Sequence, residues 1–346
     1  MSQAYGASGR DMPVGRAAGA LRSTRRAARI GKRPSGGNAL GRGLAALILC
    51  FACPCVAGTV TLCDATWHDA SRGRDIPVRI RLPAGTGRSP IILFSHGLGG
   101  SLDSGTDWTS AWAEAGLATL TLEHPGSDRH VRASGINAAG LSEQLEARVA
   151  DVRFVIDELG RRPREGRCDL QRMDLSRIGM SGHSFGAMTT EALSGQAYPL
   201  SLLAHSADPR IRASIAFSPS PPMRSRDDAA AFAGVRIPFM SITGTADFVP
   251  ITPQITAADR QRPFRAMPPG DKYLLVVGGA NHLQFNGQDG LGRDLAPDAH
   301  MRAIVVAATT AFWKATLSGD SSARRWLQDR SGLQGMLSSN DRFEYR

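Results

Sequence analysis

From about residue 58 onward, apolar runs rich in β-branched residues alternate with helical patterns. This alternation is typical of a mostly parallel sheet, because parallel neighbours need long crossovers and helices supply them. The sequence therefore predicts an α/β protein with a mostly parallel central sheet of about eight strands, helices on both faces and no large cap domain. Strands are expected at 59–66, 76–82, 91–95, 118–122, 177–181, 211–218, 237–243 and 273–277, the main helices at 108–115, 141–159, 185–193 and 300–317, and a surface loop at 262–270.

The first 57 residues have the order of an export signal. A long basic stretch is followed by an apolar run at 44–52 and by the small residues Ala57 and Gly58, which suit cleavage. The apolar run is shorter than the roughly 20 residues that a membrane-spanning helix needs. We expect a basic leader over 1–57, one folded domain over 58–346, and a periplasmic or secreted protein without a stable membrane span. A disordered tail that runs into a buried strand is the alternative.

Most of the net positive charge lies in the leader. The chain carries 41 Lys and Arg, 31 Asp and Glu and a formal net charge of +10. Nine of the basic residues but only one acid, Asp11, fall within 1–57, which leaves 32 basic and 30 acidic residues in the rest. A nucleic-acid-binding surface on the folded domain would need a larger basic excess. Nucleic acid is therefore not expected as a partner.

Two cysteines are expected in the mature protein. Cys50, Cys53 and Cys55 lie in the leader, and no partner residues at metal-binding spacing surround them. Export would place Cys63 and Cys168 in an oxidising compartment, where we expect a disulfide between them. The alternative is a buried thiol and a free thiol. No metal and no cofactor are expected.

The pentapeptide 182–186 (G-H-S-F-G) is the strongest local signal for chemistry. It lies between an expected strand and an expected helix, where G-x-S-x-G forms a sharp turn that lifts a serine hydroxyl above the sheet. Side chains in place of Gly182 or Gly186 would clash with nearby backbone. The helix N-terminus beneath the turn favours negative charge. We therefore predict Ser184 as a nucleophile, and a purely structural turn is the alternative.

A serine hydroxyl needs a general base, and the base needs a carboxylate that orients it. Turns of this kind are followed along the chain by an acid and then a histidine. Asp247 and His282 each follow an expected strand, so both lie at carboxyl ends, where ligands bind in open parallel sheets. We predict His282 as the base and Asp247 as its acid, with Glu123 or Asp228 as the acids to consider if Asp247 is the wrong choice.

The backbone N–H groups of Leu98 and Phe185 are expected to form an oxyanion hole. Leu98 lies in a glycine-rich loop after an expected strand, and Phe185 directly follows the nucleophile. Two amides so placed can donate hydrogen bonds to the negative oxygen of a tetrahedral intermediate. The nearby side chains of His96, His124 and His183 are expected to serve the structure rather than proton transfer.

Three segments together resemble known enzymes. The stretches 94–99 (F-S-H-G-L-G), 122–124 (L-E-H) and 182–187 (G-H-S-F-G-A) are similar to plasma-type platelet-activating-factor acetylhydrolases and to the bacterial proteins called predicted dienelactone hydrolases. The similarity covers about 90–327, and its closing part, 312–327, is similar to bacterial dienelactone-hydrolase-like and polyester-hydrolase sequences. The resemblance implies an α/β-hydrolase catalytic domain and a serine mechanism, but no particular substrate.

Two departures limit what the resemblance implies about the substrate. The acetylhydrolases carry their acid directly after the strand that follows the nucleophile helix, where this chain has F-S-P-S at 217–220. The acid is expected one strand later, at Asp247, as in polyester hydrolases. True dienelactone hydrolases use a cysteine nucleophile, where this chain has Ser184. An ordinary ester is therefore a better expectation than a phospholipid or a dienelactone.

Taken together, the motifs predict a serine hydrolase that cleaves a carboxylic ester through an acyl-enzyme. The expected substrate is a small-molecule, lipid or polymeric ester. An amidase or peptidase with the same triad is the first alternative, because the motif does not distinguish leaving groups. A catalytically silent binding protein on the same fold is the second.

Overall fold

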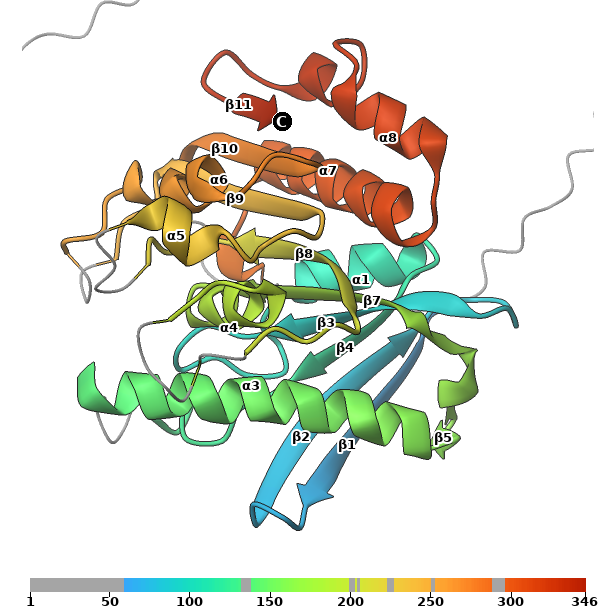
Figure 1. Cartoon of the computed structure of the whole chain (residues 1–346). Helices are drawn as coiled ribbons and strands as arrows, with labels where there is room; N and C mark the ends of the chain where they lie inside the picture. The colour runs from blue at the N-terminus through green and yellow to red at the C-terminus, as the bar shows by residue number, and fades with distance from the viewer. Residues whose placement is uncertain are drawn as a thin grey trace, which may run out of the picture. The chain divides into compact units, whose positions relative to one another are not determined.

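The computed structural model describes residues 59–131, 138–198, 203, 206–222, 227–249, 253–287 and 296–346. Its centre is a nine-stranded sheet with the order β1-β2-β4-β3-β7-β8-β9-β10-β11 (Figure 1). The strands of this sheet are β1 (Thr61–Asp69), β2 (Arg74–Leu82), β3 (Ser89–Ser95), β4 (Ala118–Leu122), β7 (Met173–His183), β8 (Ile211–Phe217), β9 (Phe239–Ala246), β10 (Lys272–Asn281) and β11 (Arg342–Tyr345). A separate pair consists of β5 (Arg164–Glu165) and β6 (Cys168–Asp169). The expected leader, 1–57, lies outside the described residues.

Most neighbouring strands of the sheet run parallel. β4, β3, β7, β8, β9 and β10 pair in parallel one after another, whereas β2 pairs antiparallel with both β1 and β4. The prediction of an α/β protein with a mostly parallel sheet is confirmed, but the sheet has nine strands and not about eight. The additional strand, β11, pairs antiparallel with β10, and its Phe343 ring stacks on Tyr273. Its four residues are too few to show a strand period in the sequence.

Helices cover both faces of the sheet, as predicted. α3 (Ala138–Arg161) and α4 (Phe185–Ser194) lie on one face, and α1 (Thr106–Glu114) and α7 (Ala299–Leu317) lie on the other (Figure 1). Between β8 and β9 the described residues form one short helix, α5 (Asp228–Phe232). Among the helices that the structure describes, none is both long and apolar enough to cross a membrane.

The strand β3 is apolar throughout because both of its faces are buried. Ile91 and Leu93 belong to the core that α3 and α4 cover, while Ile92 and Phe94 belong to the core that α1 and α7 cover. Successive side chains of a strand point to opposite faces, so a strand between two helical layers needs apolar residues at every position. β3 thus joins the two cores and ends where the glycine-rich loop begins.

Besides α5, two other short helices were not among the expected elements. The stretch 262–270, expected as a surface loop, begins with α6 (Arg262–Ala266), which has a proline in its first turn, where the fixed φ of proline suits a helix. Phe264 of α6 is only 2% exposed and packs against β10. Farther along, α8 (Ser321–Gln328) begins after Asp320. The side chain of Asp320 caps this helix by accepting hydrogen bonds from two backbone N–H groups.

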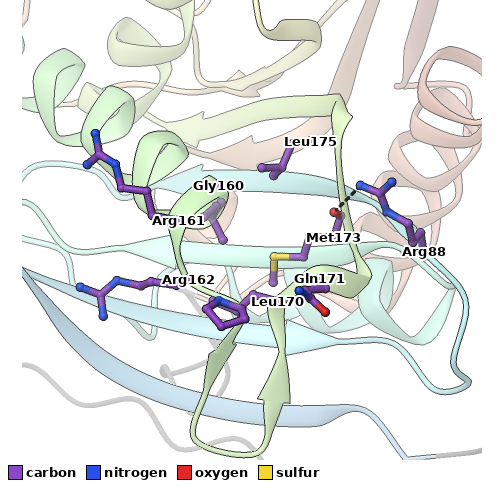
Figure 2. A pocket seen from close by; sticks show the side chains of 10 residues that line it. Arg88, Gly160, Arg161, Arg162, Leu170, Gln171, Met173 and Leu175 are labelled. Atoms are coloured by element: carbon purple, nitrogen blue, oxygen red, sulfur yellow. Dashed lines mark hydrogen bonds between the residues drawn. The ribbon is translucent and has the colours of Figure 1, made fainter.

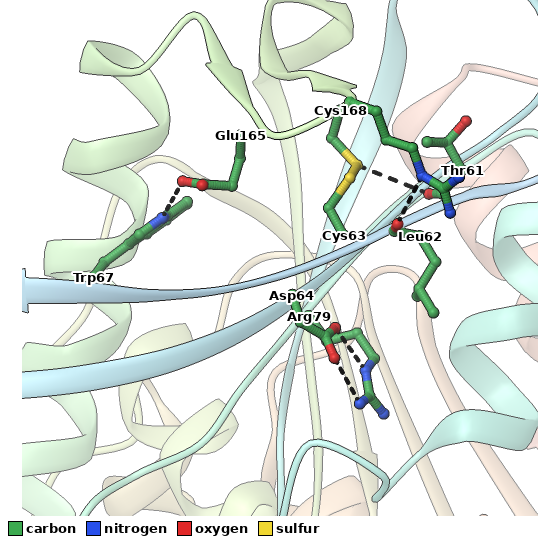
Figure 3. Close-up of a disulfide and its surroundings, with 9 residues drawn as sticks. Thr61, Leu62, Cys63, Asp64, Trp67, Arg79, Glu165 and Cys168 are labelled. Carbon is green, nitrogen blue, oxygen red and sulfur yellow. Dashed lines mark hydrogen bonds and ion pairs between the residues drawn. A yellow bond between two sulfur atoms is a disulfide. The ribbon is translucent and has the colours of Figure 1, made fainter.

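Cys63 of β1 and Cys168 of β6 form a disulfide, as predicted (Figure 3). Their Cα atoms are 6.2 Å apart, and the sequence separation between them is 105. Beside the bridge, the indole N–H of Trp67 in β1 donates a 2.9 Å hydrogen bond to the Glu165 carboxylate of β5. Because β1 is an edge strand, these contacts tie that edge of the sheet to the segment that precedes β7.

We expect the Cys63→Ala/Cys168→Ala double variant to fold but to melt at a lower temperature. Opening a loop of this length raises the conformational entropy of the unfolded chain, an effect worth up to about 4.7 kcal/mol. Thermal unfolding monitored by circular dichroism, with and without a reductant, measures the difference in melting temperature. The reductant should lower the melting temperature of the parent protein and leave that of the double variant unchanged. A parent protein that melts at the same temperature after full reduction would contradict the prediction.

Candidate active site

The predicted nucleophile lies on a strained turn between β7 and α4. Ser184 has φ 55° and ψ −111°, a backbone conformation that residues other than glycine rarely adopt. A Cβ atom on Gly182 would lie 2.4 Å from the Gly186 oxygen, and one on Gly186 would lie 1.9 Å from the Ser95 oxygen. Both positions therefore require glycine, for the steric reason that the motif predicted. The turn places the hydroxyl at the carboxyl end of β7.

The structure brings the three predicted triad residues together in one hydrogen-bonded chain. The Oγ of Ser184 lies 2.8 Å from Nε2 of His282, and Nδ1 of His282 lies 2.7 Å from Oδ1 of Asp247. Asp247 directly follows β9 and His282 directly follows β10, so the ends of three parallel strands supply the chain. Asp247 is fully buried and His282 is 5% exposed, whereas Ser184 is partly accessible.

A buried arginine that the sequence analysis missed supports Asp247. Nε of Arg260 lies 2.8 Å from Oδ1 of Asp247, and the hydroxyl of Thr243 donates to Oδ2 at 2.7 Å. Nη1 of Arg260 also donates to the backbone oxygens of Ser218 and Pro219, at 3.0 and 3.2 Å. Burial acts to raise the pKa of Asp247, but the His282 hydrogen bond and the Arg260 charge outweigh it, so the pKa is lowered. Asp247 is therefore held as a carboxylate.

His282 is held as a neutral imidazole. Burial lowers its pKa, and the charge of Arg260 lowers it further, whereas Asp247 acts to raise it; the net effect is a pKa below the ordinary 6.5. Nδ1–H donates to the carboxylate, so Nε2 is free to accept the Ser184 hydroxyl proton. Nε2–H of His183 donates to the His282 backbone oxygen at 2.9 Å, which fixes the loop that carries His282.

The two expected oxyanion donors lie beside the nucleophile. A Cβ atom on Gly97 would lie 3.5 Å from Cβ of Ser184, so the loop that continues into Leu98 runs against the turn. Phe185 is the first residue of α4, where a backbone N–H has no partner within the helix. Over the described ranges, neither the Leu98 nor the Phe185 N–H donates a hydrogen bond to a protein acceptor. An oxyanion hole requires N–H groups that no protein acceptor occupies.

The other acidic candidates have partners elsewhere. The Glu123 carboxylate accepts a hydrogen bond from the Leu102 N–H at 3.1 Å, and the Asp228 carboxylate binds Arg262 through two contacts of 2.8 Å. Asp247 is therefore the carboxylate that the structure brings to His282. In the part of the chain that the structure describes, no group of three or more His, Cys, Asp or Glu side chains is arranged to hold a metal ion.

The remaining histidines of the motifs have structural contacts. Nε2 of His96 accepts a hydrogen bond from the His124 N–H at 2.9 Å, and Nδ1–H of His124 donates to Asp151 at 2.9 Å. Both rings are fully buried, and burial lowers the pKa of each. These side chains hold the loop after β3 to the loop after β4, which agrees with the structural role expected for them.

Figure 2 shows a pocket of about 580 Å³ whose lining includes none of the triad residues. Its lining comes from the end of α3, from the start of β7 and from Arg88, which precedes β3. Arg88 donates a 3.3 Å hydrogen bond to the backbone oxygen of Met173, the first residue of β7. Ser184 follows the opposite end of the same strand, so this pocket is separate from the candidate site.

The sequence matches no family model and no curated protein. A proton can pass from Ser184 to the neutral imidazole of His282, and Asp247 remains ionised beside the imidazolium that forms. A serine in this setting can act as a nucleophile towards an electrophilic carbon.

We expect Arg260→Met to raise the pKa of His282. The buried guanidinium disfavours a second positive charge nearby, so its removal stabilises the imidazolium, which then loses its proton at a higher pH. An NMR titration of the His282 ring in both proteins measures the shift. Arg262→Met is a matched control, because Arg262 pairs with Asp228 and not with the triad. An unchanged or lower pKa in Arg260→Met would contradict this account.

Proposed function

We propose that the protein is a serine hydrolase of the α/β-hydrolase fold that cleaves a carboxylic ester through an acyl-enzyme. The observation that carries the proposal is the continuous hydrogen-bonded chain from Ser184 through His282 to Asp247. The fold assignment draws support from the strained serine between β7 and α4 and from the order of serine, acid and histidine along the chain. The substrate is proposed to be a small-molecule, lipid or polymeric ester.

In the proposed reaction, Ser184 Oγ attacks the ester carbonyl carbon while its proton passes to Nε2 of His282. The backbone N–H groups of Leu98 and Phe185 donate to the carbonyl oxygen, which becomes negative in the tetrahedral intermediate. His282 then gives the proton to the departing alcohol, and the acyl group remains on Ser184. A water molecule, deprotonated by His282, attacks the acyl-enzyme and releases the carboxylic acid. Asp247 stays ionised throughout.

We also propose that the protein is exported. The disulfide between Cys63 and Cys168 supports this proposal, because such bridges persist in oxidising compartments and are rare in the cytosol. The basic leader over 1–57 is the other argument for export, and it rests on the sequence alone.

Substitutions in the triad test the proposal. Ser184→Ala and His282→Ala should each lower kcat for a chromogenic ester by about 10⁴- to 10⁶-fold, because the triad acts as a unit. Asp247→Asn should lower kcat by up to about 10⁴-fold, because the amide favours the wrong imidazole tautomer. Circular dichroism and the melting temperature establish that each variant is folded.

Asp228→Asn and Glu123→Gln are the matched controls for the acid. Neither carboxylate contacts His282, so both variants should keep kcat close to that of the parent protein. If Ser184→Ala or His282→Ala retained near-normal activity, the serine mechanism would be wrong. If Glu123→Gln or Asp228→Asn, rather than Asp247→Asn, lost the activity, the acid would be wrong.

Chromogenic esters of graded acyl length, compared with the matching anilides, test the leaving group. We expect hydrolysis of the esters by the mature protein and much slower hydrolysis of the anilides, because an alkoxide or phenolate leaves more readily than an amine. Each rate is measured beside that of Ser184→Ala, which gives the background. Faster hydrolysis of the anilides would favour the amidase or peptidase alternative.

A further inference from the structure

A fully buried arginine, Arg148 of α3, lies behind the loop that follows β3. Its Nη1 donates to the His96 backbone oxygen at 2.6 Å, and its Nη2 reaches the Gly97 backbone oxygen at 3.4 Å. Its Nε donates to the Ser127 hydroxyl at 2.9 Å. The guanidinium carbon lies 4.4 Å from the centre of the Phe185 ring. One side chain thus contacts both segments that carry the expected oxyanion donors.

The contact with the Gly97 oxygen acts directly on one of these donors. The Gly97 oxygen and the Leu98 N–H belong to one peptide group, which is trans, so they point in opposite directions. Nδ1–H of His96 donates to the same oxygen at 2.6 Å. The Gly100 N–H also donates to it, at 3.1 Å. Together these three donors fix the plane of the peptide and polarise its N–H group. The Leu98 N–H therefore points away from Arg148 and is strengthened as a donor.

Packing alone does not explain a charge at this position. Over the described residues, Arg148 forms no ion pair with a carboxylate, and its hydrogen bonds go to neutral acceptors. Burial lowers the pKa of Arg148 to about 9, which still leaves it charged at neutral pH. The charges of Asp151 and Asp128 act to raise this pKa, but neither carboxylate forms an ion pair with Arg148. Burying a charge without a direct ionic partner costs free energy, and an apolar side chain of similar length would fill the same space. The contacts of the guanidinium thus have a use beyond packing.

We propose that Arg148 is a positioning residue that holds the Gly97–Leu98 peptide and Phe185 so that their two N–H groups converge on the oxyanion. The inference rests on the proposed serine hydrolase function and adds a residue to it. Arg148 does not touch the substrate. It acts on one donor through the Gly97 oxygen and on the other through the Phe185 ring, and α3 lies beside α4 on the same face of the sheet (Figure 1).

Arg148→Met and Arg148→Lys test the proposal in rapid-mixing hydrolysis of a chromogenic ester. Arg148→Met should lower the acylation rate constant by about 10²- to 10³-fold, the effect of losing one oxyanion donor. The ester concentration at half-saturation should change little, because the neutral carbonyl depends less on these donors than the oxyanion does. Arg148→Lys should recover part of the rate, because an ammonium can still donate to one of the carbonyls.

Two further variants separate positioning from stability. Val149→Ala removes buried volume at the next position of α3, so it should lower the melting temperature but leave the acylation rate per folded molecule unchanged. Ser127→Ala removes one acceptor of Arg148 while it leaves the charge in place. It should lower the acylation rate in the same direction as Arg148→Met by a smaller factor, and it decides the question if Arg148→Met does not fold.

The outcomes distinguish this inference from the function on which it rests. Equal acylation rates in the parent and in Arg148→Met would overturn it. A decrease in the acylation rate that only matches the decrease in the amount of folded protein would overturn it as well. If Arg148→Met does not fold, an unchanged rate in Ser127→Ala overturns it. Mass spectrometry of the quenched reaction checks for the acyl group on Ser184. A parent protein that never forms this adduct would overturn the serine hydrolase function and the role of Arg148 with it.

Discussion

The close approach of two backbones at the carboxyl ends of β3 and β7 constrains the rest of the site. Ser95 pairs with Gly182 in the register of these strands, and a Cβ atom on Gly186 would lie 1.9 Å from the Ser95 oxygen. α4 can therefore begin so close to β3 only because that residue is glycine. This close contact places the turn that carries Ser184 next to the loop that carries Leu98. The nucleophile and both expected oxyanion donors come to share one small volume.

Two buried arginines support the two halves of this arrangement. Arg260 binds the carboxylate of Asp247 on the acid side, and Arg148 binds backbone oxygens behind the loop that carries Leu98. Burial lowers the pKa of each arginine, and hydrogen bonds to backbone oxygens offset part of the desolvation. In the proposed reaction both positive charges favour the attack by Ser184. Arg260 keeps His282 neutral before the attack, and Arg148 lies on the side where negative charge develops.

The sequence predicted the parts of the molecule that depend on neighbouring residues. The turn around Ser184 has its own pattern, and the alternation of apolar runs with helical patterns is visible along the chain. Features that depend on distant contacts could not be predicted. Arg260 lies in a stretch without a motif between β9 and β10, and Arg148 is one polar position on a long amphipathic helix. β11 is stabilised as a strand by its pairing with β10, because four residues carry no period of their own.

The most direct test of the central claim is the reaction of the protein with a fluorophosphonate, which modifies a serine only when a neighbouring base activates it. Peptide mapping by mass spectrometry locates the adduct. The account predicts one adduct, on Ser184, that forms at neutral pH and is almost lost in His282→Ala. The absence of an adduct, labelling of a different serine, or labelling that proceeds equally well in His282→Ala would contradict it.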